Sequence, residues 1–229
     1  MPPTNEARRD RLADAAIELL ARTGARGLTH RAVDAEAAEP PGTTSRYFRT
    51  RDALLSAVVE RIWALHVADL GRAPAGPVDP AAIADHLAGM VYHALTRDRS
   101  RHLAGFALFL ESTRIPALHQ TMTGTRITQV EQFRKMHQAA GMEFTPRQAA
   151  MLIAAINGVI FLALTTPVAL GLRSPADVRD LIRETVHNVH RGAAQATGPA
   201  GAGAESAVVG AGPAGAGSAQ APATGRRSE

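Results

Sequence analysis

The chain has 229 residues, of which 45% are hydrophobic, and it carries a formal net charge of +4. This length and apolar content suffice for one sizeable core or two smaller ones, and the basic excess mildly favours a polyanionic partner. The chain contains no cysteine, which excludes disulfides, thiolate zinc sites and cysteine nucleophiles.

The N-terminal sequence MPPTNEARRDRLADAA has no apolar segment of the kind that a secretion signal needs. The most apolar run, residues 149–172, is interrupted by Asn157 and Pro167, which is typical of a buried helix and not of a transmembrane span. We therefore expect a cytoplasmic protein with no membrane partner.

Up to residue 191 the pattern predicts an all-α fold of about nine helices, because strand-like alternation of β-branched and polar residues is missing. The first predicted helix begins near Asn5 and ends around Gly24 and Gly27. A short helix follows, with Thr29 as its N-cap and an end near Ala38. A Pro-Pro-Gly turn at 40–42 then breaks the chain.

A very short helix is predicted from Thr43 or Thr44 to Phe48, and a long one begins beside Asp52. The segment GRAPAGPV at 71–78 is the clearest internal boundary. Later helices are predicted to start at Asp79-Pro80, near Arg101, at Pro116, at Thr145-Pro146 and at Ser174-Pro175. Residues 192–229 are almost entirely Ala, Gly, Pro, Ser and Thr, which predicts a disordered tail.

A helix-turn-helix is predicted over residues 27–55, GLTHRAVDAEAAEPPGTTSRYFRTRDALL. In this segment a tight Pro/Gly turn separates two short predicted helices, and longer helices flank them on both sides. The second short helix is small, polar and basic, as a helix that enters the DNA major groove must be. Residues 43–51 hold three arginines and no acid, which favours DNA binding over a merely solvated face.

This segment resembles the TetR/AcrR family of transcriptional regulators. The matching pieces are GLT at 27–29, RAV at 31–33, PGT at 41–43, RYF at 46–48 and ALL at 53–55. The run FALFLESTRIPAL at 106–118 is similar to the sensor domains of some members. The resemblance implies a DNA-binding domain over residues 1–50 and a helical effector-binding and dimerisation domain over 51–191, followed by the tail over 192–229.

Carried over by position, the resemblance implies a set of DNA contacts: Thr29, Tyr47 and Arg51 on phosphates, His30 and Arg31 at the groove edge, and Thr43, Thr44, Ser45 and Arg46 as the reading face. Two positions depart from the family pattern. Thr44-Ser45 stands where many members have Leu-Tyr, and Glu39 stands where an apolar turn residue is common.

Residues 79–191 contain no phosphate-binding loop, no HExxH and no serine elbow, so we predict neither an enzyme nor a cofactor. Residues 146–166 are apolar nearly all round, which favours burial on several faces. That burial occurs either within one core or in a four-helix homodimer interface formed with residues 175–191. We favour the homodimer, because a palindromic operator is bound by a two-fold symmetric protein.

Large side chains of this half are candidates for the lining of an apolar ligand cavity: Trp63, His66, Met90, His93, Phe106, Phe109, Met122, Phe133 and Phe161. The amide of Asn157, in the most apolar helix, is expected to meet either an interface partner or a ligand. His187 and His190 have the spacing of a metal-binding pair, but we interpret them as part of a helix surface and predict no metal.

The sequence therefore predicts a sequence-specific DNA-binding regulator, most simply a homodimeric repressor that an apolar small-molecule effector releases from double-stranded operator DNA. One alternative is a small-molecule-binding protein or enzyme whose helix-turn-helix is vestigial. The other is a transcriptional activator, since the sign of control depends on where the operator lies.

Overall fold

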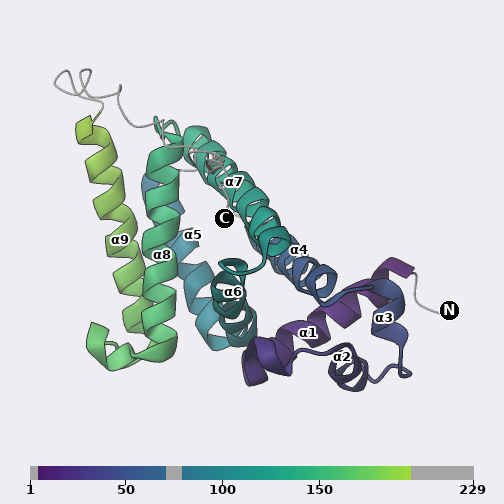
Figure 1. Ribbon diagram of the computed structural model, residues 1–229. Coiled ribbons are helices and arrows are strands. Elements are labelled where there is room, and N and C mark those ends of the chain that lie inside the picture. Colours follow the sequence, from purple (N-terminus) through teal and green to yellow (C-terminus); the bar gives the residue numbers. More distant parts are fainter. Residues whose placement is uncertain (1–4, 71–78, 197–229) are drawn as a thin grey trace, which may run out of the picture.

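The computed structural model describes residues 5–70 and 79–196. Within these two ranges all regular structure is helical and no strand is present, which confirms the predicted all-α fold (Figure 1). The elements are α1 (Asn5–Gly27), α2 (His30–Glu36), α3 (Thr43–Tyr47), α4 (Arg51–Leu70), α5 (Pro80–Thr96), α6 (Arg99–Ser112), α7 (Pro116–Ala139), α8 (Pro146–Thr165), the 3₁₀ turn η1 (Pro167–Leu170) and α9 (Pro175–Ala196).

Several helices begin where the sequence places an N-capping residue. The Thr29 hydroxyl accepts a hydrogen bond at 3.1 Å from the backbone of the first turn of α2, and the Asp79 carboxylate does the same for α5 at 2.7 Å. At the start of α8, Thr145 and Gln148 form a reciprocal capping box. Each cap satisfies backbone N–H groups that have no partner within the helix, and this accounts for the accuracy of these predicted starts.

Helix α1 kinks at Gly24, which adopts a positive φ of 68°, and ends at Gly27, the second of the two glycines at which its end was expected. The end of one helix differs from the sequence-based expectation. Helix α9 extends to Ala196, so residues 192–196 are helical and not part of a disordered tail. Alanine has the highest helix propensity, which favours continuation of α9 through this alanine-rich stretch. The expected boundary at 71–78 and the rest of the tail, 197–229, lie outside the described residues.

A first hydrophobic core joins α1 to the helices around it. Leu12 and Leu20 of α1 are buried together with Val33 of α2 and with Leu54 and Leu55 of α4. Each fully buried leucine contributes about 1.5–3 kcal/mol relative to an exposed one. The first half of α4 and one face of α6 belong to this core, so it extends across the expected domain boundary at residue 50.

A second core lies among α5, α7, α8 and α9. Figure 1 shows α8 and α9 side by side on the side of the molecule away from α2 and α3. Helix α8 contributes the buried side chains Leu152, Ile156 and Ile160 to this core, and α9 contributes Ile182 and Val186. The apolar face of α9 is therefore used largely within the subunit.

Helix α8 remains apolar on the face that points away from this core. Met151 is 58% exposed and Leu162 is 37% exposed, with Gly158 between them on the same exposed face. Among the described helices, α8 is the one that could cross a membrane by length and composition alone, and 33% of its most apolar window is buried. Packing into the second core accounts for one apolar face of α8 and leaves the opposite face uncovered.

Candidate functional site

A buried carboxylate fixes the angle between α2 and α3. Asp34 of α2 is 3% exposed and accepts hydrogen bonds from the Gly42 backbone N–H at 2.7 Å and from the Thr44 backbone N–H at 2.6 Å. The Thr44 hydroxyl donates a third bond to Asp34 at 2.5 Å. Burial raises the pKa of Asp34, but the bonds from Thr44 and Gly42 outweigh it and hold the pKa below its usual value.

The structure does not place the whole expected reading face at the surface. Thr43 and Thr44 are 2% and 0% exposed, respectively, and the Thr43 hydroxyl donates to the Pro40 carbonyl at 2.6 Å. Their expected contact with bases is therefore corrected: both side chains serve the turn between α2 and α3. A short helix must turn one side toward the core, and in α3 that side is made of hydrogen-bonded threonines. Ser45 and Arg46 are exposed.

The other expected DNA contacts occupy different environments. Arg31 is exposed on α2, while Tyr47 is partly buried against the first core. The ring Nε2 of His30 lies 2.6 Å from the Phe48 carbonyl oxygen and links the start of α2 to the end of α3. The Arg51 guanidinium donates to the Ala25 carbonyl at 2.6 Å and so points toward the end of α1.

The Asp34 carboxylate and the contact between His30 and the Phe48 carbonyl link α2 to α3, and the Arg51 guanidinium links the start of α4 to the end of α1. Arg31, Ser45, Arg46 and Arg49 are left exposed on α2, on α3 and just beyond it. Their roles at DNA stay predictions, as do those of Thr29, His30, Tyr47 and Arg51.

Glu39, the acid in the turn between α2 and α3, forms ion pairs with two arginines. The Glu39 side chain is 8% exposed and lies 2.8 Å from Arg11 and 3.2 Å from Arg8, both on α1. The hydrogen bond from Arg11 holds the pKa of Glu39 below its usual value, although burial raises it. Two arginines of α1 thus pair with Glu39 at the position in the turn where apolar packing is common.

A cavity of about 420 Å³ lies between α4, α5, α6, α7 and α8. All five side chains predicted at a ligand site, Trp63, His66, Phe106, Phe109 and Asn157, line it, as do Met90, His93, Met122 and Phe133. Phe161 is not part of the lining, and its ring packs edge-on against Phe106 with the centroids 5.1 Å apart. The structure therefore places the five predicted residues around one cavity, while their part in binding a ligand stays a prediction.

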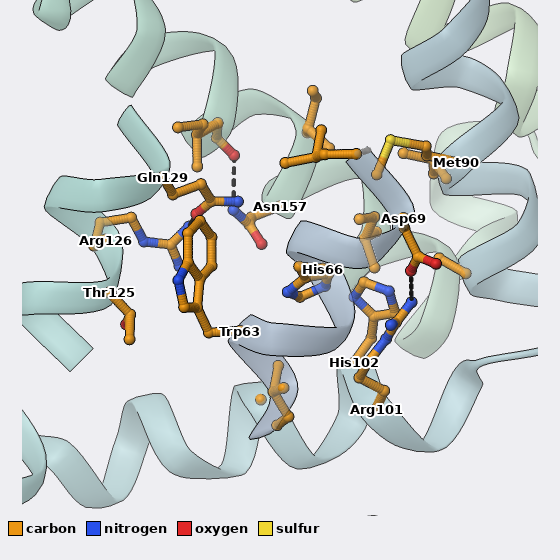
Figure 2. A pocket seen from close by; sticks show the side chains of 18 of the residues that line it. Trp63, His66, Asp69, Met90, Arg101, His102, Thr125, Arg126, Gln129 and Asn157 are labelled. Carbon is orange, nitrogen blue, oxygen red and sulfur yellow. Dashed lines mark hydrogen bonds and ion pairs between the residues drawn. The ribbon is translucent and has the colours of Figure 1, made fainter. Parts of the chain in front are cut away.

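One side of the cavity carries two histidines and an ion pair. The rings of His66 and His102 lie 5.4 Å apart, and Arg101 donates to Asp69 at 2.7 Å (Figure 2). Burial lowers the pKa of His66 to about 3 and that of His102 to about 4, so both imidazoles are neutral at neutral pH. The Nε2 atom of His102 is buried and has no hydrogen-bond partner in the described structure.

A second polar group lies beside Trp63, where α7 faces α8 (Figure 2). Arg126 donates a hydrogen bond to the Gln129 side chain, and its guanidinium lies 5.1 Å from the centre of the Phe109 ring. The Asn157 amide donates to the Ile153 carbonyl at 2.8 Å, which leaves its carbonyl oxygen for another partner. Arg126 and Gln129 were not predicted, because polar residues on an amphipathic helix are normally assigned to the solvent side.

The described residues contain no cluster of three metal-ligating side chains. His187 is exposed, as expected for a helix surface, but His190 is buried. Its Nε2 atom lies 3.0 Å from Nε2 of His137 on α7, and the His137 ring stacks on Phe144 with the centroids 3.9 Å apart. The surface expectation is therefore wrong for His190, which faces α7 and not solvent.

Comparison with known proteins gives one family and several similar structures. Residues 78–192 match the tetracyclin-repressor-like C-terminal domain. Comparison with curated protein sequences gives no match. A TetR-family member from Streptomyces coelicolor A3 is 27% identical with a TM-score of 0.60, and the match covers 78% of this chain and 97% of that chain.

Two further solved structures have the same fold. EbrR, a multidrug binding protein solved with ethidium, is 27% identical with a TM-score of 0.60 over 78% of this chain and 98% of its own. A transcriptional regulator from Rhodococcus sp. Rha1 is 22% identical with a TM-score of 0.66 over 81% of this chain and 97% of its own. The family match covers half of the sequence and lies C-terminal to the helix-turn-helix segment and α4. The chain therefore belongs to the TetR family of transcriptional regulators.

Proposed function

We propose that this protein is a cytoplasmic, homodimeric repressor that binds a palindromic operator through α2 and α3 and is released when a small molecule enters the cavity. The observation that carries this proposal is the position of α6. Ala104 and Leu108 of α6 are buried in the first core, while Phe106 and Phe109 of the same helix line the cavity. A ligand that displaces α6 therefore acts directly on the packing beneath α1.

Helix α4 provides a second mechanical link between the two halves. Its residue Arg61 donates to Asp14 of α1 at 2.7 Å and to Asp10 at 2.9 Å, while Trp63 and His66 face the cavity. Movement of α4 on ligand binding is expected to change the spacing of the two α3 helices in a dimer. The major grooves that they must reach lie about 34–36 Å apart, and effector coupling in such systems is typically ~1–3 kcal/mol.

The small-molecule part of the proposal is supported by the lining of the cavity, which is mostly apolar and aromatic with a few polar groups, as ligand pockets usually are. It is also supported by EbrR, whose structures contain ethidium and proflavin. We infer that the protein binds its effector without converting it, because the family to which the chain belongs consists of transcriptional regulators.

The exposed face of α8 is the proposed dimer interface. Replacing Leu162 with glutamate (Leu162→Glu) is expected to convert a dimer into a monomer, because two copies of the charge would meet across the two-fold axis. Light scattering coupled to size-exclusion chromatography measures the change. Lys135→Gln, at an exposed position on α7 and outside both helices expected in the interface, is the control and leaves the mass unchanged. A Leu162→Glu protein that remains dimeric would place the interface elsewhere.

DNA binding is tested by selecting bound sequences from a random duplex library with the purified protein at two salt concentrations. We expect an enriched palindrome. Against that sequence, Arg31→Ala and Arg46→Ala are each expected to cost about 1–3 kcal/mol of binding free energy per half-site, because each removes an exposed guanidinium from the DNA-facing side. Lys135→Ala, an exposed cation on α7, is the control. Binding without sequence preference that vanishes at the higher salt would leave only phosphate attraction and contradict the proposal.

A further inference from the structure

The charged side chains that line the cavity do not balance one another. They are Asp69, Arg101 and Arg126. Asp69 and Arg101 form an ion pair at 2.7 Å, and Arg101 also lies 2.8 Å from Asp98, which is 40% exposed and is not part of the lining. Among the residues that the structure describes, Arg126 contacts no carboxylate: its hydrogen bond is to the neutral Gln129 amide.

Burial lowers the pKa of Arg126, and no neighbouring acid offsets that effect. A guanidinium nevertheless remains protonated in proteins, so the cavity wall holds a positive charge that has lost part of its hydration. A ligand carboxylate restores this lost stabilisation, because arginine binds carboxylates through parallel, charge-assisted hydrogen bonds.

The neighbouring histidines do not alter this charge. His66 and His102 are neutral at neutral pH, since their pKa values are about 3 and 4. The uncompensated charge of the lining is therefore that of Arg126. It lies beside Trp63, Gln129 and Asn157, and the cavity beyond them is mainly apolar (Figure 2).

We propose that the cavity binds an apolar carboxylic acid, whose carboxylate pairs with the Arg126 guanidinium while its apolar body lies among the rings of Trp63 and Phe106. Gln129 and the free carbonyl of Asn157 border the same end of the cavity and are suited to hold a water or a polar substituent of the ligand. The inference rests on the proposed function in one respect: it takes the cavity to be the effector site.

The test uses three ligands with the same two-ring body and different charge: 1-naphthaleneacetic acid, its neutral amide 1-naphthaleneacetamide, and the cation 2-(1-naphthyl)ethylammonium. Each is titrated into the full-length protein by isothermal calorimetry at neutral pH. The acid is expected to bind at least about ten-fold more tightly than the amide and the cation, as a charge-assisted contact in a water-poor site predicts. Arg126→Gln is expected to remove this preference, and Arg126→Lys to retain most of it.

Arg134→Gln is the matched control, because Arg134 lies on the same helix, is paired with Glu131 at 2.6 Å and does not line the cavity. It is expected to leave all three affinities unchanged. The inference is overturned by equal or tighter binding of the cation, by a preference that survives in Arg126→Gln, or by no measurable binding of the acid. Calorimetry needs no DNA, so an Arg126-dependent preference for the acid supports the inference even in a protein that fails to select an operator.

Discussion

Replacing Asp34 with alanine (Asp34→Ala) is expected to lower the free energy of unfolding by about 3–5 kcal/mol and to abolish specific operator binding. The substitution removes the acceptor of three hydrogen bonds and leaves the Thr44 hydroxyl and the Gly42 and Thr44 backbone N–H groups without it. Unpaired buried donors each cost about 1–3 kcal/mol. Urea unfolding followed by circular dichroism measures the stability, and a gel-shift titration on the selected operator measures the affinity.

Operator binding is expected to be lost even where the variant stays folded. The reason is that Asp34 sets the position of the whole of α3 and not of one side chain. Asp34→Asn keeps the shape of the side chain and one acceptor oxygen, so an intermediate stability is expected. Asp52→Ala, an exposed acid in the first turn of α4, serves as the control. If Asp34→Ala unfolded at the same urea concentration as the control, the hydrogen bonds to Asp34 would not hold the two helices together.

Acidification from about pH 7.5 to about pH 5 is expected to lower the free energy of unfolding by about 2 kcal/mol for each of His66, His102 and His190. Burial lowers the pKa of His190 to about 4, as it lowers those of the other two. In the unfolded chain all three have the ordinary value of 6.5. Between these values the unfolded state binds more protons, so stability is lost as the pH falls below the unfolded pKa.

Urea titrations at the two pH values and at one protein concentration measure this loss, since the stability of a dimer depends on concentration. His102→Asn is expected to reduce the pH-dependent loss of unfolding free energy by the contribution of one histidine. His187→Asn, which replaces an exposed imidazole on α9, is expected to leave it unchanged. A stability that is flat from neutral to mildly acidic pH would show that these histidines are protonated in the folded protein.

The sequence predicted the helices well because their starts carry local chemical signals. Thr29, Asp79 and Thr145 each cap a helix through their own side chain, so a few neighbouring residues determine where the helix begins. Helix ends were predicted less well. The end of α9 depends on how far an alanine-rich stretch continues, and no local residue stops it before Ala196.

The side on which a polar residue lies was harder to predict than the helix that contains it. Thr43 and Thr44 are polar and sit in the expected recognition helix, yet their hydroxyls donate to Pro40 and Asp34 in the interior. Arg126 is a similar case, since this charged residue, which the sequence did not single out, lines a cavity. In both cases the outcome depends on how the helix packs against the rest of the chain, which the periodicity of the sequence does not report. The aromatic lining of the cavity was easier to predict, because large apolar side chains in a small helical bundle are normally buried.

The sharing of the first core between the two halves limits how this chain can diverge. Leu54 and Leu55 of α4 and Leu108 of α6 pack with the side chains of α1, although they follow the helix-turn-helix in sequence. A recombination event that joined this helix-turn-helix to the sensing half of a distant relative would bring mismatched side chains into that core. New operator specificities are therefore expected to arise by substitution at exposed positions such as Arg31 and Ser45, and new effectors by substitution around the cavity, while the inward faces of α1, α4 and α6 are inherited together.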